Sequence, residues 1–268
     1  MKKLITISSL LVVGTFVAGA ASVVPQDLQN ENLLFYWDFA TSADPTKKPG
    51  SVSVNKDHLT WNEAGYGHSE RSAIYSSNVG NADLYANNFT VSFDVANFTA
   101  NNWENLLSVY TNGSSGDSHA LMLQKNNSGK MMLYVGGIGG NTNYFGGSTT
   151  SKNAEFVDYS TVHNSDWTTL TFTSDGSTFK VYVDGVAVGE GASLTTTETK
   201  ITGFQFLSAF GGSRVATSGD LDNIAIWNTA LTAAQVSSLC APVPEPSMFG
   251  LLAGLGALSL VGARRRRR

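Results

Sequence analysis

The sequence is poor in cysteine, histidine and charge, and each shortage argues against a class of protein. Cys240 is the single cysteine among 268 residues, which excludes an intrachain disulfide. It reads as an incidental free thiol in a linker, with an intermolecular bridge as the alternative. The four histidines lack the His-x-x-x-His and Glu-x-x-His spacings of a metal site. A hydrophobic core, rather than disulfide or zinc staples, is therefore expected to hold the fold together.

Two common catalytic loop motifs are missing as well. Gly113-Ser114-Ser115-Gly116 has the wrong spacing for the nucleophile elbow of a serine hydrolase. The glycine-rich stretch 136–147 is not followed by a helical pattern, so it does not read as a phosphate-binding loop. We expect it to be a surface loop that carries Tyr144 and Phe145. A catalytic triad assembled from residues far apart in the sequence has no local motif, so it stays an alternative.

Positive charge is scarce in the central part of the chain. Lys2, Lys3 and the five arginines 264–268 lie at the two ends, which leaves 10 of the 17 basic residues in between, against 20 of the 21 acidic ones. The central region therefore has a formal charge of −10, although the whole chain carries −4. Such an acidic surface argues against nucleic acid and anionic lipid as partners.

The first 20 residues have the pattern of an export signal. Residues 1–3 supply a positive start, residues 4–17 form an uncharged apolar run, and residues 18–20 are small, as signal peptidase requires. The apolar run is too short for a transmembrane helix. We expect cleavage near Ala20 and export of the chain.

The last 26 residues carry three features in order. Val243-Pro244-Glu245-Pro246 comes first, an uncharged apolar run over 248–262 follows, and the chain ends in a cluster of Arg264, Arg265, Arg266, Arg267 and Arg268. As a helix the run spans about 22 Å, short of the roughly 30 Å hydrocarbon core, and snorkelling arginines make up part of the difference. The arginines favour a cytoplasmic location for this end, so the region between the two ends lies outside the cytoplasm.

This tail resembles the PEP-CTERM sorting signal of Gram-negative bacteria, whose proteins are handled by an exosortase. The resemblance implies export, an inner-membrane intermediate held by the C-terminal segment, processing near Pro-Glu-Pro, and a destination at the cell surface or in the extracellular matrix. A generic tail anchor is the alternative. The predicted organisation is a signal peptide over 1–20, one domain over 21–240 and the sorting signal over 241–268.

Residues 167–191 alternate apolar and polar side chains with the period of a half-buried strand. Leu170 and Phe172 point to one face, between threonines that point to the other. Asp175-Gly176 and Asp184-Gly185 then supply two tight turns, because glycine accepts a positive φ. The stretch therefore predicts three consecutive antiparallel strands.

Similar patterns elsewhere predict an all-β domain. One helix is expected after Thr232, where Gln235 completes a capping box. Residues 61–81 are expected to be irregular, and strict alternation over 221–227 places Asp222 on the face opposite Asn223. Further strands are expected over 33–39, 51–54, 88–95, 106–110, 120–124, 131–135 and 201–207. The predicted fold is a two-sheet antiparallel jelly-roll sandwich, flanked by an N-terminal signal helix and a C-terminal hydrophobic helix.

The order of these elements resembles the laminin G-like, concanavalin A-like jelly rolls. Residues 167–173, 180–185, 219–228 and 230–236 carry the resemblance, which covers most of 33–239. It implies a twisted sandwich that often binds glycans or proteins, with calcium in some members. Glucanases of this fold place Glu-x-Asp-x-x-Glu on one strand, whereas the nearest spacing here is Asp220-Leu221-Asp222, without a glutamate. We therefore expect the protein not to be an enzyme.

Candidate ligand-binding residues fall into two sets. Aromatic faces stack on sugars, which makes Trp103, Tyr110, Tyr144 and Phe145 the candidates for a glycan site. Core packing is the competing explanation for the first two, and Trp167 is expected in the core. Calcium is the one cofactor considered, with Asp117, Asp220 and Asp222 as candidate ligands. Aspartates that bond neighbouring backbone are the favoured alternative, because no Asp-x-Asp-x-Asp-Gly loop occurs.

Three functional hypotheses follow. The first is an exosortase-sorted surface or matrix protein whose jelly roll binds a glycan, an exopolysaccharide of its own cell, without catalysis. The second is a structural or adhesive module that contacts proteins or neighbouring copies. The third and weakest is a carbohydrate-active enzyme with an atypical site. The expected partners are signal peptidase, exosortase and extracellular polysaccharide. The fold alone does not choose among the hypotheses, because one architecture hosts many functions.

Overall fold

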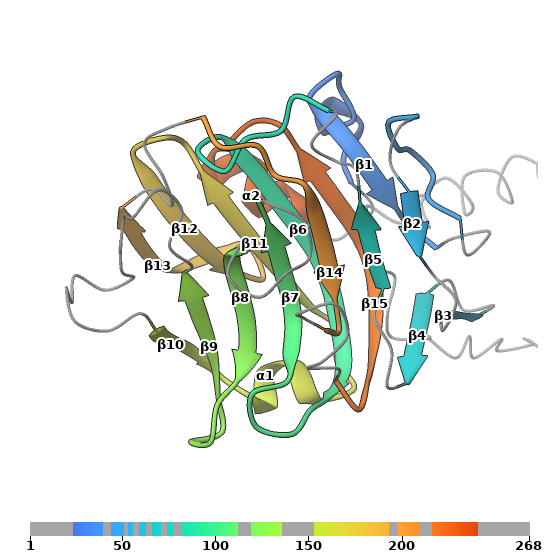
Figure 1. Cartoon of the computed structure of the whole chain (residues 1–268), viewed down its shortest axis with the longest axis vertical. Helices are drawn as coiled ribbons and strands as arrows, with labels where there is room; N and C mark the ends of the chain where they lie inside the picture. Colours follow the sequence, from blue (N-terminus) through green and yellow to red (C-terminus); the bar gives the residue numbers. More distant parts are fainter. Residues whose placement is uncertain are drawn as a thin grey trace, which may run out of the picture.

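Two antiparallel sheets pack face to face in the computed structural model of the chain (Figure 1). The structure describes residues 24–39, 44–50, 53–55, 59–62, 66–70, 74–77, 82–111, 119–135, 153–192, 198–208 and 216–240. The predicted signal helix and C-terminal hydrophobic helix lie outside these residues. In the described part of the chain, none of the helices has the length and apolar character needed to cross a membrane.

The two sheets differ in size and in what covers them. The seven-stranded sheet has the order β10-β9-β8-β7-β14-β5-β2. Its strands are β2 (Ser53–Asn55), β5 (Ile74–Ser77), β7 (Asn105–Tyr110), β8 (His119–Lys125), β9 (Lys130–Val135), β10 (Asn153–Asp158) and β14 (Gly203–Phe206). The eight-stranded sheet has the order β13-β12-β11-β6-β15-β4-β3, and β1 pairs with β15. Its strands are β1 (Leu33–Trp37), β3 (Leu59–Asn62), β4 (Tyr66–Glu70), β6 (Phe89–Thr99), β11 (Thr168–Ser174), β12 (Thr178–Val183), β13 (Val186–Ala192) and β15 (Ser218–Trp227).

The main core lies between the sheets and is rich in phenylalanine. Phe93 of β6 stacks on Phe172 of β11 with ring centroids 6.5 Å apart, and it meets Phe206 of β14 edge-on at 5.2 Å. All three rings are buried, and each contributes about 1.5–3 kcal/mol through removal from water. The predicted alternation of β6 and β11 is confirmed, because these apolar side chains share the inner face.

A second, smaller core covers the outer face of the eight-stranded sheet. It joins β1 and the short helices η1 (Gln26–Leu28) and α2 (Ala233–Leu239) to side chains such as Trp227 and Tyr182. The Trp227 indole donates a hydrogen bond to the carbonyl of Leu28 at 2.9 Å, which fixes the N-terminal segment. The predicted capping box of α2 is confirmed, with reciprocal bonds between Thr232 and Gln235. β1 belongs to that sheet through its pairing with β15, and η1 and α2 pack with it in the second core; we call β1, η1 and α2 together the outer layer.

The expectation of an irregular segment over 61–81 is wrong. The structure places β4 and β5 there, together with the end of β3. β4 has little apolar character, and it forms because its backbone pairs with β15 on one side and β3 on the other. One of its outer side chains, His68, is bonded to Asp220 of β15. Pairing with neighbours, rather than its own hydrophobic pattern, thus makes this segment a strand.

Strict alternation in β15 is also a wrong prediction. The register of β15 against β6 shifts between Asp222 and Ala225, as at a β-bulge, and Asn223 has a φ of 47°. The extra residue resets the pattern, so Leu221, Ile224 and Ile226 all join the main core. Asp222 and Asn223 are consequently held next to Asp94, on the outer face.

Candidate functional site

Trp103 stands in the loop between β6 and β7 with 42% of its surface exposed. It is one of three large hydrophobic side chains that the described residues expose. Its φ of 71° lies in the left-handed region, which a bulky side chain rarely adopts. The conformation costs about 1–2 kcal/mol, and the rest of the loop must hold it.

Hydrogen bonds to β8 and within the loop itself hold the Trp103 loop. The backbone N–H of Trp103 donates to the carbonyl of Lys125 at 2.7 Å, and the N–H of Lys125 donates to the carbonyl of Glu104 at 3.1 Å. The Glu104 carboxylate accepts from the backbone and the side chain of Asn101, at 2.6 and 2.9 Å. The exposed indole is therefore carried on a fixed backbone, which lowers the entropy that a ligand must overcome on binding.

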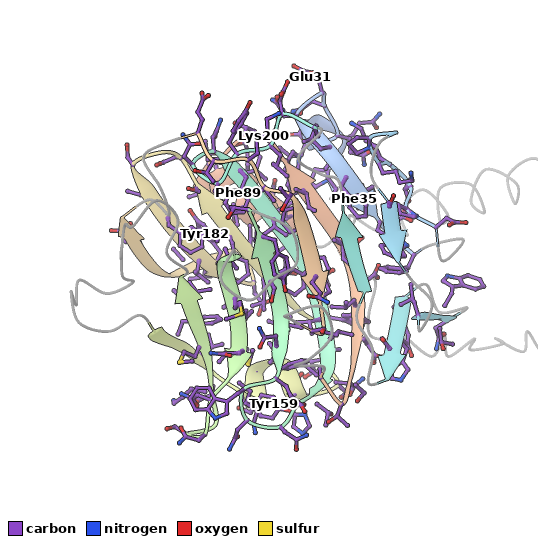
Figure 2. All side chains as sticks on the ribbon, viewed as in Figure 1. Glu31, Phe35, Phe89, Tyr159, Tyr182 and Lys200 are labelled. Carbon is purple, nitrogen blue, oxygen red and sulfur yellow. The ribbon has the colours of Figure 1, made fainter. Side chains whose placement is uncertain are left out.

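The loop is continuous with a polar and aromatic cluster at the same end of the sandwich. The Lys125 ammonium donates to the Asn102 side chain at 3.0 Å and lies 4.9 Å from the ring centroid of Tyr159. Tyr159, which Figure 2 labels at the lower end, stacks on His163 of α1 (Ser160–His163) with centroids 4.8 Å apart. Its hydroxyl donates to the carbonyl of Phe98 at 2.8 Å. Burial raises the pKa of Tyr159, so it stays a donor at neutral pH.

These contacts give the lower end the chemistry of a sugar-binding surface. An exposed indole offers a flat apolar face, and Asn101, Asn102, Glu104 and Lys125 around it offer donors and acceptors for hydroxyl groups. We call this surface, Asn101–Glu104 with Lys125 and Tyr159, the Trp103 surface. Trp103 is absent from both core clusters, so core packing does not explain its position.

The expectation that Tyr110 is an exposed aromatic is wrong. Its side chain is 3% exposed, and its hydroxyl donates to the Gln205 side chain of β14 at 2.7 Å. Alternation turns Tyr110 away from the main core, yet that face is buried as well, so the ring is not available for stacking. Tyr144 and Phe145 lie outside the described residues, and their predicted role stays a prediction.

The outer face of the seven-stranded sheet carries buried amides that sequence reasoning missed. Asn105 of β7 and Gln124 of β8 are direct neighbours in register, and they are 0% and 5% exposed. Within the part of the chain that the structure describes, Asn105 Oδ1 and Gln124 Oε1 are buried acceptors without a hydrogen-bond partner. Buried polar groups of this kind commonly bind ordered water. Alternation after the buried Leu123 would have turned Gln124 out to solvent, and Asn105 precedes the strand expected over 106–110.

Three aspartates come together on the outer face of the eight-stranded sheet. Asp222 of β15 lies directly opposite Asp94 of β6, and Asp220 precedes Asp222 by two residues on the same strand. Their exposures are 2%, 2% and 6%. Asp220 accepts a hydrogen bond from Asn97 Nδ2 at 2.6 Å and is bonded to His68 Nδ1.

The environment of Asp222 sets it apart from an ordinary carboxylate. Burial, helped by the nearby carboxylates Asp94 and Asp38, raises its pKa to about 8, while the N–H of Asn223 opposes the shift. That N–H donates to Asp222 Oδ1 at 2.7 Å. Asp222 is therefore mostly protonated at neutral pH, whereas unperturbed aspartates are ionised.

Calcium binding stays an untested prediction. Asp220 and Asp222 are engaged by protein donors, as expected of aspartates that bond neighbouring groups, and Asp117 lies outside the described residues. Within the described ranges, no group of three His, Cys, Asp or Glu side chains is arranged to hold a metal ion.

Two further sequence expectations need correction. Trp167 is half-buried and meets Tyr66 edge-on at 5.6 Å on the sheet surface, whereas it was expected in the core. Cys240 is not in a linker but caps the C-terminus of α2, half-buried against the second core. Burial raises the pKa of its thiol to about 11, which makes it unreactive at neutral pH.

Comparison with known proteins agrees with both resemblances predicted from the sequence. Residues 72–237 match the family model described as the concanavalin A-like lectin/glucanases superfamily, and residues 242–268 match the PEP-CTERM protein-sorting motif. The comparison with curated proteins gave no match.

Similar solved structures share the fold at low identity. Trypanosoma rangeli sialidase matches with a TM-score of 0.58 at 15% identity, over 81% of this chain and 33% of that one. The ligand-binding domain of botulinum neurotoxin serotype D in complex with N-acetylneuraminic acid matches with a TM-score of 0.56 at 15% identity, over 77% and 50%. The binding domain of Paraclostridial Mosquitocidal Protein 1 gives 0.55 at 13%, over 78% and 52%. The chain thus spans a third to a half of these proteins, and the likeness concerns the fold alone.

Proposed function

The chain belongs to the concanavalin A-like lectin/glucanase superfamily, and we propose that its sandwich is a non-catalytic glycan-binding module displayed outside the cell. The exposed and rigidly held Trp103 carries this proposal. Strained backbone conformations cluster at functional sites, so an exposed tryptophan held at a φ of 71° supports a binding role.

The ligand proposed is a polysaccharide made by the producing cell. The central region has a formal charge of −10, so an uncharged or weakly charged glycan suits the surface better than a polyanion. The similar neurotoxin domain is in complex with N-acetylneuraminic acid. That sugar carries a carboxylate, and the acidic surface of the present chain disfavours it here.

The sorting motif supports display at the cell surface. A PEP-CTERM motif implies an exported chain processed by an exosortase. We further propose an inner-membrane intermediate, followed by release to the surface or matrix of a Gram-negative cell. Replacing Pro244, Glu245 and Pro246 with alanine should leave the protein in the inner membrane. Normal surface delivery of that variant would contradict this route.

Affinity electrophoresis through gels that contain the producer's extracellular polysaccharide tests the binding proposal. The wild-type protein should be retarded, Trp103→Ala should migrate freely, and Trp103→Phe should keep part of the retardation because it keeps a ring. Val186→Ser is the matched control, because Val186 is 66% exposed but belongs to β13. Equal retardation of wild type and Trp103→Ala would reject the Trp103 surface as the site.

Exposed valines favour the adhesive module as a second candidate. Val186 and Val188 of β13 are 66% and 39% exposed, on the last strand in the order of its sheet. Edge strands with apolar side chains pair readily with other chains. If this function holds, a Val186→Ser, Val188→Ser double variant should lose self-association or protein binding and keep glycan retardation.

Burial of the aspartates supports a non-catalytic role. Asp220 and Asp222 share a strand and a face, which is the arrangement of a carboxylate pair in glycosidases. Both are under 10% exposed, so a substrate does not reach them in this structure. Turnover of the cell's own polysaccharide that disappears in Asp222→Asn would instead support the enzyme hypothesis.

A further inference from the structure

The outer edge of β15 changes partner at Asp222. Residues Ser218–Leu221 pair with β4, and Ile224–Trp227 pair with β1, so Asp222 and Asn223 fall in the gap between the two partners (Figure 1). On its other edge β15 pairs with β6, where Asp94 is the direct neighbour of Asp222. The buried carboxylates of Asp94 and Asp222 are thus neighbours at the bulge.

A chain of hydrogen bonds runs through this gap and ties the outer layer to the sheet. The Tyr36 hydroxyl of β1 donates to Asn223 Oδ1 at 3.2 Å, and Asn223 Nδ2 donates to Asp94 Oδ2 at 2.9 Å. Thr169 of β11 donates to Asp94 Oδ1 at 2.6 Å. Four strands, β1, β15, β6 and β11, therefore depend on Asp94 and Asn223 staying in place.

The titratable groups around Asp222 are acidic, apart from His68 of β4, which is bonded to Asp220. Asp94 faces it from β6, Asp38 from the end of β1 and Asp220 from its own strand, and Tyr36 of β1 completes the set. On the α2 side, Cys240 lies close enough to Asp94 and Asp184 for their charges to raise the pKa of its thiol. Two ionised carboxylates side by side in a buried position repel strongly, so a neutral Asp222 is the form that this packing accepts.

We propose that the Asp94–Asp222 pair is a proton-dependent latch for the outer layer. With one proton on the pair, the hydrogen-bond chain from Tyr36 to Thr169 holds β1 in place, and α2 packs with β1 in the second core. Loss of that proton at alkaline pH places two negative charges in the gap and loosens the layer. The sorting motif begins at residue 242, two residues after the C-cap of α2. The latch therefore acts on the elements that directly precede the sorting segment.

Cys240 makes the latch measurable in the full-length protein, because it is the single thiol of the chain. The rate of its alkylation by iodoacetamide is measured between pH 6 and 10 for wild type and for Asp222→Asn, which keeps the shape and cannot ionise. The ratio of the two rates removes the ionisation of the thiol itself, because the charges that act on it, Asp94 and Asp184, are the same in both proteins.

The proposal predicts that the ratio of the wild-type rate to the Asp222→Asn rate rises between pH 6 and about pH 8, by up to about tenfold per pH unit, and levels off above pH 8. Ser174→Ala, a change on β11 away from the gap, should follow wild type at every pH. A ratio that stays at one up to pH 10 would overturn the proposal. If Asp222→Asn is alkylated quickly at all pH values, the side chain acts as a fixed hydrogen-bonding group and the latch is equally rejected.

Discussion

Asp94 and Asp222 are direct cross-strand neighbours on β6 and β15, and each is 2% exposed. Like charges in this arrangement are destabilising, and the fold accommodates them by keeping Asp222 neutral. The pair lies where β15 exchanges β4 for β1, so its ionisation bears on the attachment of the outer layer rather than on the main core.

The free energy of unfolding should fall as pH rises from about 4 to about 8. The pKa of Asp222 is raised in the folded state, so the folded protein binds more protons than the unfolded chain over this range. Its stabilising contribution is complete below pH 4 and is lost as pH approaches 8, by up to about 1.4 kcal/mol per pH unit. Urea unfolding at several pH values measures this slope.

Two variants separate the charge of the pair from its hydrogen bonds. Asp222→Asn should flatten the slope and be more stable than wild type at pH 8. Asp94→Asn should instead cost about 1–3 kcal/mol at pH 6, because Asp94 accepts bonds from Thr169 and Asn223. An unchanged slope in Asp222→Asn would assign the pH dependence to other groups.

The backbone at Trp103 should prefer glycine to alanine. With a φ of 71°, alanine retains the steric cost of the left-handed region and glycine does not. We expect Trp103→Gly to be more stable than Trp103→Ala by about 0.5–1 kcal/mol in thermal unfolding. Equal stability, or a more stable alanine variant, would mean that the loop relaxes freely and does not carry the Trp103 indole on a fixed backbone.

Gly185 should be the less replaceable of the two turn glycines in the β11–β13 meander. Both have a positive φ, 85° at Gly176 and 76° at Gly185. A Cβ at Gly185 would lie 3.0 Å from the Cα of Ser237 in α2, whereas at Gly176 the nearest atom, the carbonyl oxygen of Asn87, is 3.6 Å away. Gly176→Ala should cost about 1 kcal/mol and Gly185→Ala about 2–3 kcal/mol by chemical denaturation. Similar costs would show that α2 does not press on this turn.

Local patterns predicted the parts of the fold that local chemistry determines. The capping box at Thr232 and Gln235 and the glycine turns at Gly176 and Gly185 depend on residues next to one another, and the structure contains them. β4 was missed because its pairing with β15, about 150 residues away, makes it a strand. The bulge at Asn223 was missed because its amide is satisfied by Tyr36 and Asp94, which are also distant in the sequence.

In the candidate site too, the sequence predicted the residue types, whereas contacts between distant residues determined their exposure. Trp103 was selected from the sequence by residue type, but its exposure and its φ follow from contacts with β8. Tyr110 was selected by the same rule and is buried on the sheet. The Asp94–Asp222 pair was invisible because alternation identifies the face of a side chain and not the residue opposite it.

Isothermal titration calorimetry of the purified protein with the producer's fractionated polysaccharide tests the central claim most directly. We predict binding by the wild-type protein and at least a tenfold weaker Kd, about 1.4 kcal/mol, for Trp103→Ala, with Val186→Ser unchanged. Equal affinities of wild type and Trp103→Ala, or no binding by either, would contradict the assignment of this domain as a glycan-binding module that acts through Trp103.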